Sequence, residues 1–142
     1  MKDESHRGNR GLKNLQFRFA YFTPKYEETV AFYRDGLELK VVGSWDRTPD
    51  HRGTVFKAAS GMIEVLAFPS SGESDHLWDA RPPQGAFMVI EMENVELLYK
   101  LALEKGLPIQ EALKEHPWGH RGFCISDPNG LTIFFFSEME NG

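Results

Sequence analysis

The chain has 142 residues, of which 41% are hydrophobic and 13% aromatic, so its length and apolar content fit one domain with a real core. Acidic side chains (21) outnumber basic ones (16), and the formal net charge of -5 argues against a duplex nucleic-acid binder, which needs a basic face. A single cysteine, Cys124, excludes a disulfide framework within the chain and favours a reducing, cytoplasmic location. No apolar run reaches membrane-spanning length, so we expect no membrane partner.

Residues 1–14 are too polar for a signal peptide, and we expect them to form a loosely ordered tail. Residues 15–22 alternate as in a strand, which places Arg18 and Phe19 on opposite faces. Apolar residues at helical spacing from Tyr26 to Leu37 predict a helix that ends at Gly36. Further strands are predicted at 39–45, 54–59 and 62–68, with a polar loop at 46–53.

The second half of the chain repeats this order after a linker rich in Ser, Gly and Pro at 69–84. Asn94 is typical of a helix N-cap and Gly106 of a helix end. Strands are predicted at 86–92, 109–113, 122–126 and 131–137, with a strong turn signal at 127–130. The sequence therefore predicts an α+β fold: one domain (15–142) built from two βαβββ modules, 15–68 and 85–138. One such module cannot cover both faces of its sheet alone, so the two are expected to enclose a cavity with a curved mixed sheet.

Four segments within this duplicated frame carry a family resemblance. They are AFYRDGL at 31–37, GMIE at 61–64, WGHR at 118–121 and DPNG at 127–130. In this order and spacing the chain resembles the vicinal oxygen chelate superfamily, which includes glyoxalases, bleomycin-resistance proteins, extradiol dioxygenases and fosfomycin-resistance enzymes. The resemblance covers about residues 15–138. Fold alone does not fix the chemistry of such a protein.

The resemblance implies metal ligands on the first and last strand of each module in the metal-dependent members. A divalent metal needs about three or four ligand groups within about 2–2.5 Å. Glu64 matches the family's carboxylate, but the equivalent position in the second module is Phe134, and Phe87 stands where a His or Gln is expected. The first strand offers Arg18, or Gln16 if the pairing slips by two residues. These residues predict no metal site and no cofactor.

Arg18 and Glu64 are expected to replace the metal with an ion pair across the cavity, because a guanidinium suits a carboxylate. Arg18 could instead extend into solvent at the mouth of the pocket. Phe87 and Phe134 are expected to make the other half of the cavity apolar, although they could also only fill the core between the sheets.

The loop aromatics complete the candidate ligand site. Trp45 and Trp118 are placed at strand ends, where an indole could stack on a planar ligand or seal a dimer interface. Trp78 is more typical of an interface or surface residue. His120 is a candidate polar ligand contact or a hydrogen-bonded structural histidine, and a metal site on His116 and His120 is disfavoured because their spacing lacks helical alignment.

The resemblance thus predicts a metal-free protein, similar to bleomycin-resistance proteins, that binds a small aromatic or cationic molecule without turning it over. The candidate ligand-binding residues are Arg18, Glu64, Phe87, Trp118, His120, Phe134 and Trp45, with no catalytic residue. The alternative is a divergent metal-dependent lyase, isomerase or dioxygenase that uses Glu64, Gln16 and loop histidines. The family also implies a homodimer in which modules of two chains complete each cavity.

Overall fold

The computed structural model describes residues 16–48, 51–67 and 84–139. The tail predicted at 1–14, nearly all of the linker at 69–84 and Trp78 lie outside them. The described elements are, in chain order, β1 (Arg18–Thr23), α1 (Tyr26–Ala31), a π-helical segment η2 (Phe32–Gly36), β2 (Val41–Thr48), β3 (His51–Ala58), β4 (Gly61–Ala67), β5 (Phe87–Glu91), α2 (Val95–Glu104), β6 (Ile109–Glu115), β7 (His120–Ser126) and β8 (Thr132–Glu138). This order confirms the two predicted βαβββ modules.

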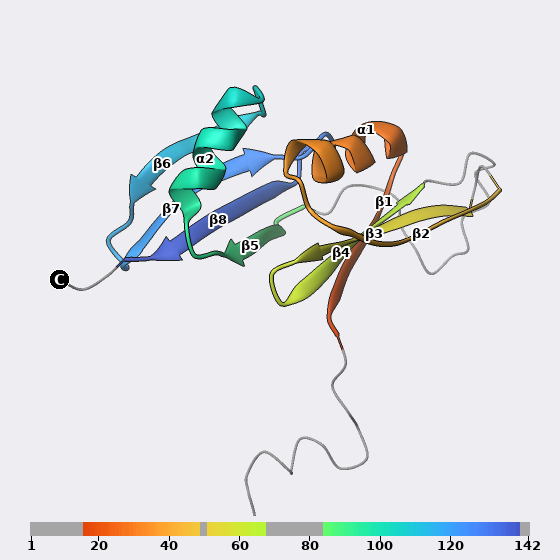
Figure 1. Cartoon of the computed structure of the whole chain (residues 1–142), viewed down its shortest axis with the longest axis horizontal. Coiled ribbons are helices and arrows are strands. Elements are labelled where there is room, and N and C mark those ends of the chain that lie inside the picture. Colours follow the sequence, from red (N-terminus) through yellow and green to blue (C-terminus); the bar gives the residue numbers. More distant parts are fainter. Residues whose placement is uncertain (1–15, 49–50, 68–83, 140–142) are drawn as a thin grey trace, which may run out of the picture.

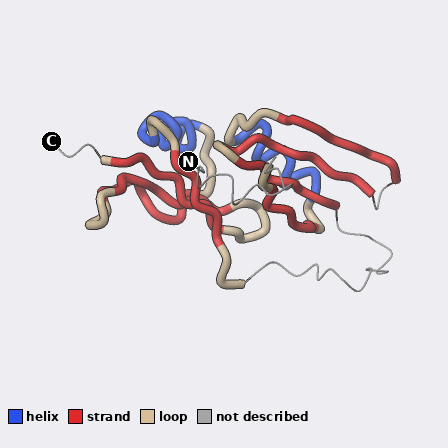
Figure 2. Tube along the Cα trace, turned by 90° about the horizontal axis from the view of Figure 1, so that it is seen from below, coloured by secondary structure: helices blue, strands red, loops and turns tan. Residues whose placement is uncertain are grey.

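Each module contributes one four-stranded mixed sheet. The strand orders are β1-β4-β3-β2 and β5-β8-β7-β6, with β1 parallel to β4 and β5 parallel to β8. Both helices lie on the same side of the two sheets, above them in Figure 1. Figure 2 shows the two groups of strands side by side. We call the sheet surfaces that face away from the helices the open faces.

Alternation along the last strand of each module separates the core from the open face. In β4, Ile63 is buried while Glu64 is half-buried, and in β8, Phe135 is buried while Phe134 is half-buried. The buried side chains form one core that includes residues of both modules and the helix residues Val30, Tyr33, Val95 and Ala102. The open faces are left for other contacts.

The boundaries of α2 follow its local sequence signals. Asn94 caps α2 by accepting a hydrogen bond from the backbone N–H of Leu97 at 3.3 Å, as predicted. Gly106 follows α2 at a φ of 66°, a left-handed conformation that glycine adopts without strain. Among the described residues, neither helix is long and apolar enough to cross a membrane.

The predicted loop at 46–53 is wrong for most of its length. β2 continues to Thr48 and β3 begins at His51, with Asp46 paired to Arg52 in the ladder. Arg52 lies over the Tyr26 ring at 4.5 Å and forms an ion pair with Glu27. The polar composition of this segment is typical of a loop. Its contacts with α1 nevertheless hold it in a longer hairpin.

A buried polar network joins the two modules. Tyr21 of β1 donates to Asp127 at 2.6 Å and lies 2.9 Å from the hydroxyl of Tyr33. Asp127 also accepts hydrogen bonds from the backbone N–H groups of Asn129 and Leu131, both at 2.8 Å. Burial raises the pKa of both tyrosines above the ordinary value, so their hydroxyls stay neutral donors. The turn predicted at 127–130 is thus also a joint between modules.

Candidate functional site

Arg18 and Glu64 form the predicted ion pair on the open face of the first sheet. Arg18 Nη1 lies 2.9 Å from Glu64 Oε1, and Arg18 Nε donates to Gln16 Oε1 at 2.7 Å. The contact confirms the predicted pairing, but its predicted position across a cavity is wrong. β1 and β4 are adjacent, and Glu64 is level with Ala20, so the pair is a diagonal neighbour pair within one sheet. The Arg18 side chain is 44% exposed and that of Glu64 17%, so the pair is also partly solvated.

The equivalent positions of the second module carry two phenylalanines. Val89 is level with Phe134 in the β5–β8 ladder, as Ala20 is level with Glu64 in the first module. Phe87 and Phe134 therefore match Arg18 and Glu64. Both lie on the open face rather than in the core, and Phe87 is 59% exposed. Within one chain, the polar pair therefore lies on the first sheet and the two phenylalanines lie on the second.

Each open face has one aromatic ring packed against a glycine of the adjoining strand. The Trp45 indole covers Gly53, where an added Cβ would lie 2.2 Å from it. The Phe134 ring covers Gly122, where an added Cβ would lie 2.8 Å from it. A side chain at either glycine would displace a ring. These two positions therefore need glycine for close approach rather than for a turn.

A continuous row of rings occupies the open face of the second sheet. Trp118 stacks on His116 at 4.4 Å between centroids, and His116 meets Phe134 edge-on at 5.4 Å. Phe134 stacks on Phe136 at 5.7 Å, and Phe136 on His120 at 4.0 Å. We call these five residues the aromatic strip. It brings together three of the predicted ligand residues, Trp118, Phe134 and His120.

Two members of the strip, His116 and Phe136, were missed as site residues. Phe136 could have been inferred, because it alternates with Phe134 along β8 and so shares its face. His116 had no such signal, since it precedes a turn and its orientation depends on that turn. The backbone N–H of His116 donates to His120 at 2.7 Å, and Gly119 takes a φ of 91°.

Both histidines of the strip have a carboxylate neighbour. His120 Nε2 donates to Glu138 Oε1 at 3.1 Å, so His120 is hydrogen-bonded within the protein, one of its two predicted roles. His116 Nε2 lies 3.5 Å from Glu111 Oε1 without a hydrogen bond to it. The Glu111 carboxylate is also 3.6 Å from the Lys114 ammonium.

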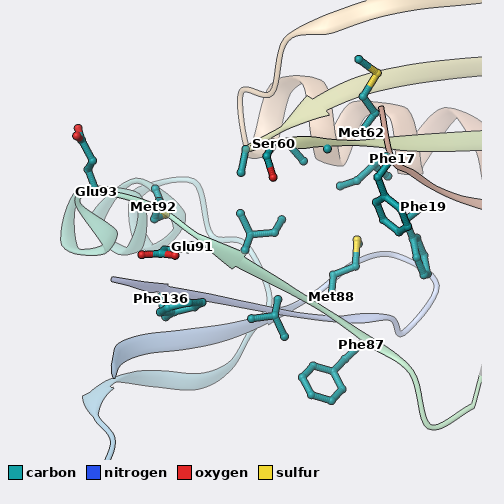
Figure 3. Close-up of a pocket in the computed structure, with 16 residues that line it drawn as sticks. Phe17, Phe19, Ser60, Met62, Phe87, Met88, Glu91, Met92, Glu93 and Phe136 are labelled. Atoms are coloured by element: carbon teal, nitrogen blue, oxygen red, sulfur yellow. The ribbon is translucent and has the colours of Figure 1, made fainter. Parts of the chain in front are cut away.

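An open groove of about 960 Å³ lies where the two modules meet. Figure 3 shows Phe17, Phe19 and Met62 of the first module on one side and Phe87, Met88 and Phe136 of the second on the other. Phe136 belongs both to the groove lining and to the aromatic strip. The lining includes neither Arg18 nor Glu64, so the groove and the ion pair are separate features.

The residues at the family's ligand positions do not fit a divalent metal. Glu64 is the carboxylate among them, and both it and the amide of Gln16 accept hydrogen bonds from Arg18. In the part of the chain that the structure describes, no group of three or more His, Cys, Asp or Glu side chains converges as a metal site would require. Burial raises the pKa of the Cys124 thiol, which disfavours the thiolate form that binds metals.

Comparison with known proteins agrees with this architecture. The family model of the glyoxalase/bleomycin resistance protein/dioxygenase superfamily matches residues 16–135. The chain belongs to this superfamily. Over 127 residues it is 28% identical to the uncharacterized protein YycE of Bacillus subtilis (strain 168), covering 87% of this chain and 88% of the other.

Two solved structures show the same fold at low sequence identity. TioX from Micromonospora sp. ML1 has a TM-score of 0.72 at 14% identity, covering 89% of this chain and 100% of TioX. TnmS3, an antibiotic binding protein from Streptomyces sp. CB03234, has a TM-score of 0.67 at 17% identity, covering 89% of this chain and 97% of TnmS3. At such identities the likeness concerns the fold alone.

Proposed function

We propose that this protein binds a small aromatic or cationic molecule without a metal ion and without turning it over. The observation that carries the proposal is the Arg18–Glu64 contact at 2.9 Å. Because a guanidinium neutralises the one family carboxylate, a divalent cation there would first have to displace Arg18. Phe87 and Phe134 at the equivalent positions offer no ligand atom.

The aromatic strip supports the ligand class. Ligand sites are mostly apolar surfaces with a few polar groups that fix orientation, and the strip combines three carbocyclic or indole rings with two histidines. The net charge of -5 favours cationic over anionic ligands at long range. TnmS3, which has the same fold, is an antibiotic binding protein. The single cysteine fits a cytoplasmic setting.

We also propose that the protein acts as a homodimer in which one chain's first module faces the partner's second module. Three apolar side chains at β1 and β5 support this: Phe17 is 69% exposed, Phe87 59% and Val89 53%. Burial of such side chains stabilises an interface. Sedimentation should give the dimer mass at micromolar concentration, and a stable monomer would contradict this proposal.

Thermal-shift measurements on chelator-stripped protein test the function. Nickel, zinc, manganese and ferrous iron are each expected to leave Tm unchanged. A planar aromatic cation from a screening panel, at about 100 times its Kd, should raise Tm by roughly 5 °C. Glu64→Gln and the distant surface change Glu104→Gln serve as a matched pair of charge removals.

A metal that raises Tm in the unmodified protein and in Glu104→Gln, but not in Glu64→Gln, would contradict the proposal. In that case the lyase, isomerase or dioxygenase alternative would replace it. A panel in which no aromatic compound shifts Tm would also count against ligand binding.

A further inference from the structure

The groove between the modules follows the edge of the second sheet. Among the described strands, β5 pairs with β8 alone, and every residue from Phe87 to Glu93 lines the groove. Phe17 and Phe19 line it from the first module. Its volume of about 960 Å³ is within the range of small-molecule sites. The groove shares only Phe136 with the aromatic strip, so it is a separate place for a ligand.

The charged side chains of the groove lie at the end opposite to three phenylalanines. Figure 3 shows Glu91 and Glu93 at one end, and Phe17, Phe19 and Phe87 at the other. The two glutamates are the charged residues of the described lining, and both are exposed. In the part of the chain that the structure describes, no cation forms an ion pair with either carboxylate. This end of the groove therefore presents negative charge that a cationic ligand could compensate.

The apolar part of the lining is adaptable. It includes three methionines, Met62, Met88 and Met92. The unbranched methionine side chain has three rotatable bonds and a polarizable sulfur, so it fits ligands of irregular shape. A flexible aliphatic chain suits such a surface, whereas a rigid planar ligand would need flat rings on which to stack.

The distance between the two ends sets the length of a matching ligand. Phe87 and Glu91 are the first and last residues of β5. At about 3.3 Å per residue, the four steps between them span ~13 Å. An extended chain covers about 1.2 Å per bond, so an alkyl chain of about ten carbons spans this distance.

We propose that the groove is a binding site for linear amphipathic cations, with an alkyl chain along β5 and its ammonium group beside Glu91 and Glu93. This site is additional to the proposed function, because it lies in the groove and takes an aliphatic ligand. A second copy of the chain is the other candidate occupant, since Phe17 and Phe87 also support the proposed dimer. Groove packed on groove about a two-fold axis, however, would supply only the same carboxylates and would leave them uncompensated.

Calorimetric titration of the full chain with alkyltrimethylammonium ions of six to fourteen carbons, below the concentrations at which they form micelles, tests the inference. Affinity is expected to rise about tenfold for each added pair of carbons and to level off near ten carbons. Decanesulfonate, which has the same chain length but a negative head, should bind at least about tenfold more weakly than decyltrimethylammonium.

Two substitutions with matched controls locate the ligand. Phe87→Ser should weaken the decyl compound about tenfold but leave the hexyl compound within about twofold, because the shorter chain does not reach from Glu91 to Phe87. Leu97→Ser removes a similarly exposed apolar side chain from α2 and should change neither. The double change Glu91→Gln with Glu93→Gln should weaken both compounds alike, about tenfold, whereas Glu104→Gln should weaken neither.

Melting temperatures identify any variant that fails to fold, and Phe17→Ser, at the same end of the groove, then replaces Phe87→Ser. An affinity independent of chain length, decanesulfonate binding as tight as that of the cation, or equal losses of the hexyl and decyl compounds in Phe87→Ser would overturn the inference. Sedimentation should give the same mass with and without decyltrimethylammonium. A dimer that the cation converts to monomer would assign the groove to a second copy instead. The proposed function is decided separately, by the metals and the aromatic panel.

Discussion

The two modules share one backbone plan but carry opposite chemistry on their open faces. Where the first module has Arg18 and Glu64, the second has Phe87 and Phe134. Their core faces differ much less, as Ile63 and Phe135 are both buried under the helices. Packing against a helix keeps the core positions apolar, whereas the open faces are under no such constraint. The two modules therefore share one frame, while the two halves of the candidate site differ in polarity.

The turns between the last two strands of each module differ as well. The β7–β8 turn contains Asp127, which is 3% exposed and bonded to Tyr21 of the other module. The β3–β4 turn contains Ser60, which is exposed and borders the groove. One turn therefore joins the modules through buried hydrogen bonds, and the other ends at an open surface.

Asp127→Ala should cause the largest loss of stability, about 3 kcal/mol, because it leaves the Tyr21 hydroxyl and two backbone N–H groups without their acceptor. The matched change in the first module, Ser60→Ala, should stay within about 0.5 kcal/mol. Urea unfolding of both variants measures the difference. Equal losses would show that the two turns contribute equally to stability and would contradict the difference drawn between the modules.

Alkaline pH should destabilise the joint between the modules. Burial holds the pKa of Tyr21 and Tyr33 above the ordinary value near 10, so the folded state retains protons that the unfolded chain releases. Their contribution is fully present below about pH 10 and is lost as pH rises above it, at about 1.4 kcal/mol per pH unit for each tyrosine. In Tyr21→Phe, one fewer proton is released on unfolding. The unfolding free energy should therefore fall with pH less steeply, by about 1.4 kcal/mol per pH unit. The same alkaline slope in both proteins would contradict this account.

Arg18→Met should destabilise the protein much less than Asp127→Ala, by at most about 1 kcal/mol, because the Arg18 side chain is 44% exposed and solvent screens the pair. The double change Arg18→Met with Glu64→Leu, which makes the first open face as apolar as the second, should recover part of that loss. A double-mutant cycle by chemical denaturation measures the coupling. A loss of several kcal/mol from Arg18→Met alone would instead indicate a buried pair, as the sequence had suggested.

Local patterns in the sequence determined most of the fold. Alternation along β1 placed Arg18 and Phe19 on opposite faces, Asn94 and Gly106 marked the ends of α2, and the repeated order of elements predicted two modules. These features depend on neighbours a few residues away, which strand geometry, capping and backbone conformation constrain directly. The pairing of Arg18 with Glu64 followed once the family order of strands was known.

Tertiary structure alone decided the rest of the candidate site. The stacking of Trp118 on His116 depends on a turn conformation, and the bond between Tyr21 and Asp127 joins residues from different modules. The extension of the β2–β3 hairpin through Asp46 and Arg52 depends on contacts with α1. No local propensity encodes such contacts, because they form only when elements distant in sequence pack together. The sequence by itself therefore determined the two-module frame and the polarity of each open face, and the packing of the modules decided which rings meet.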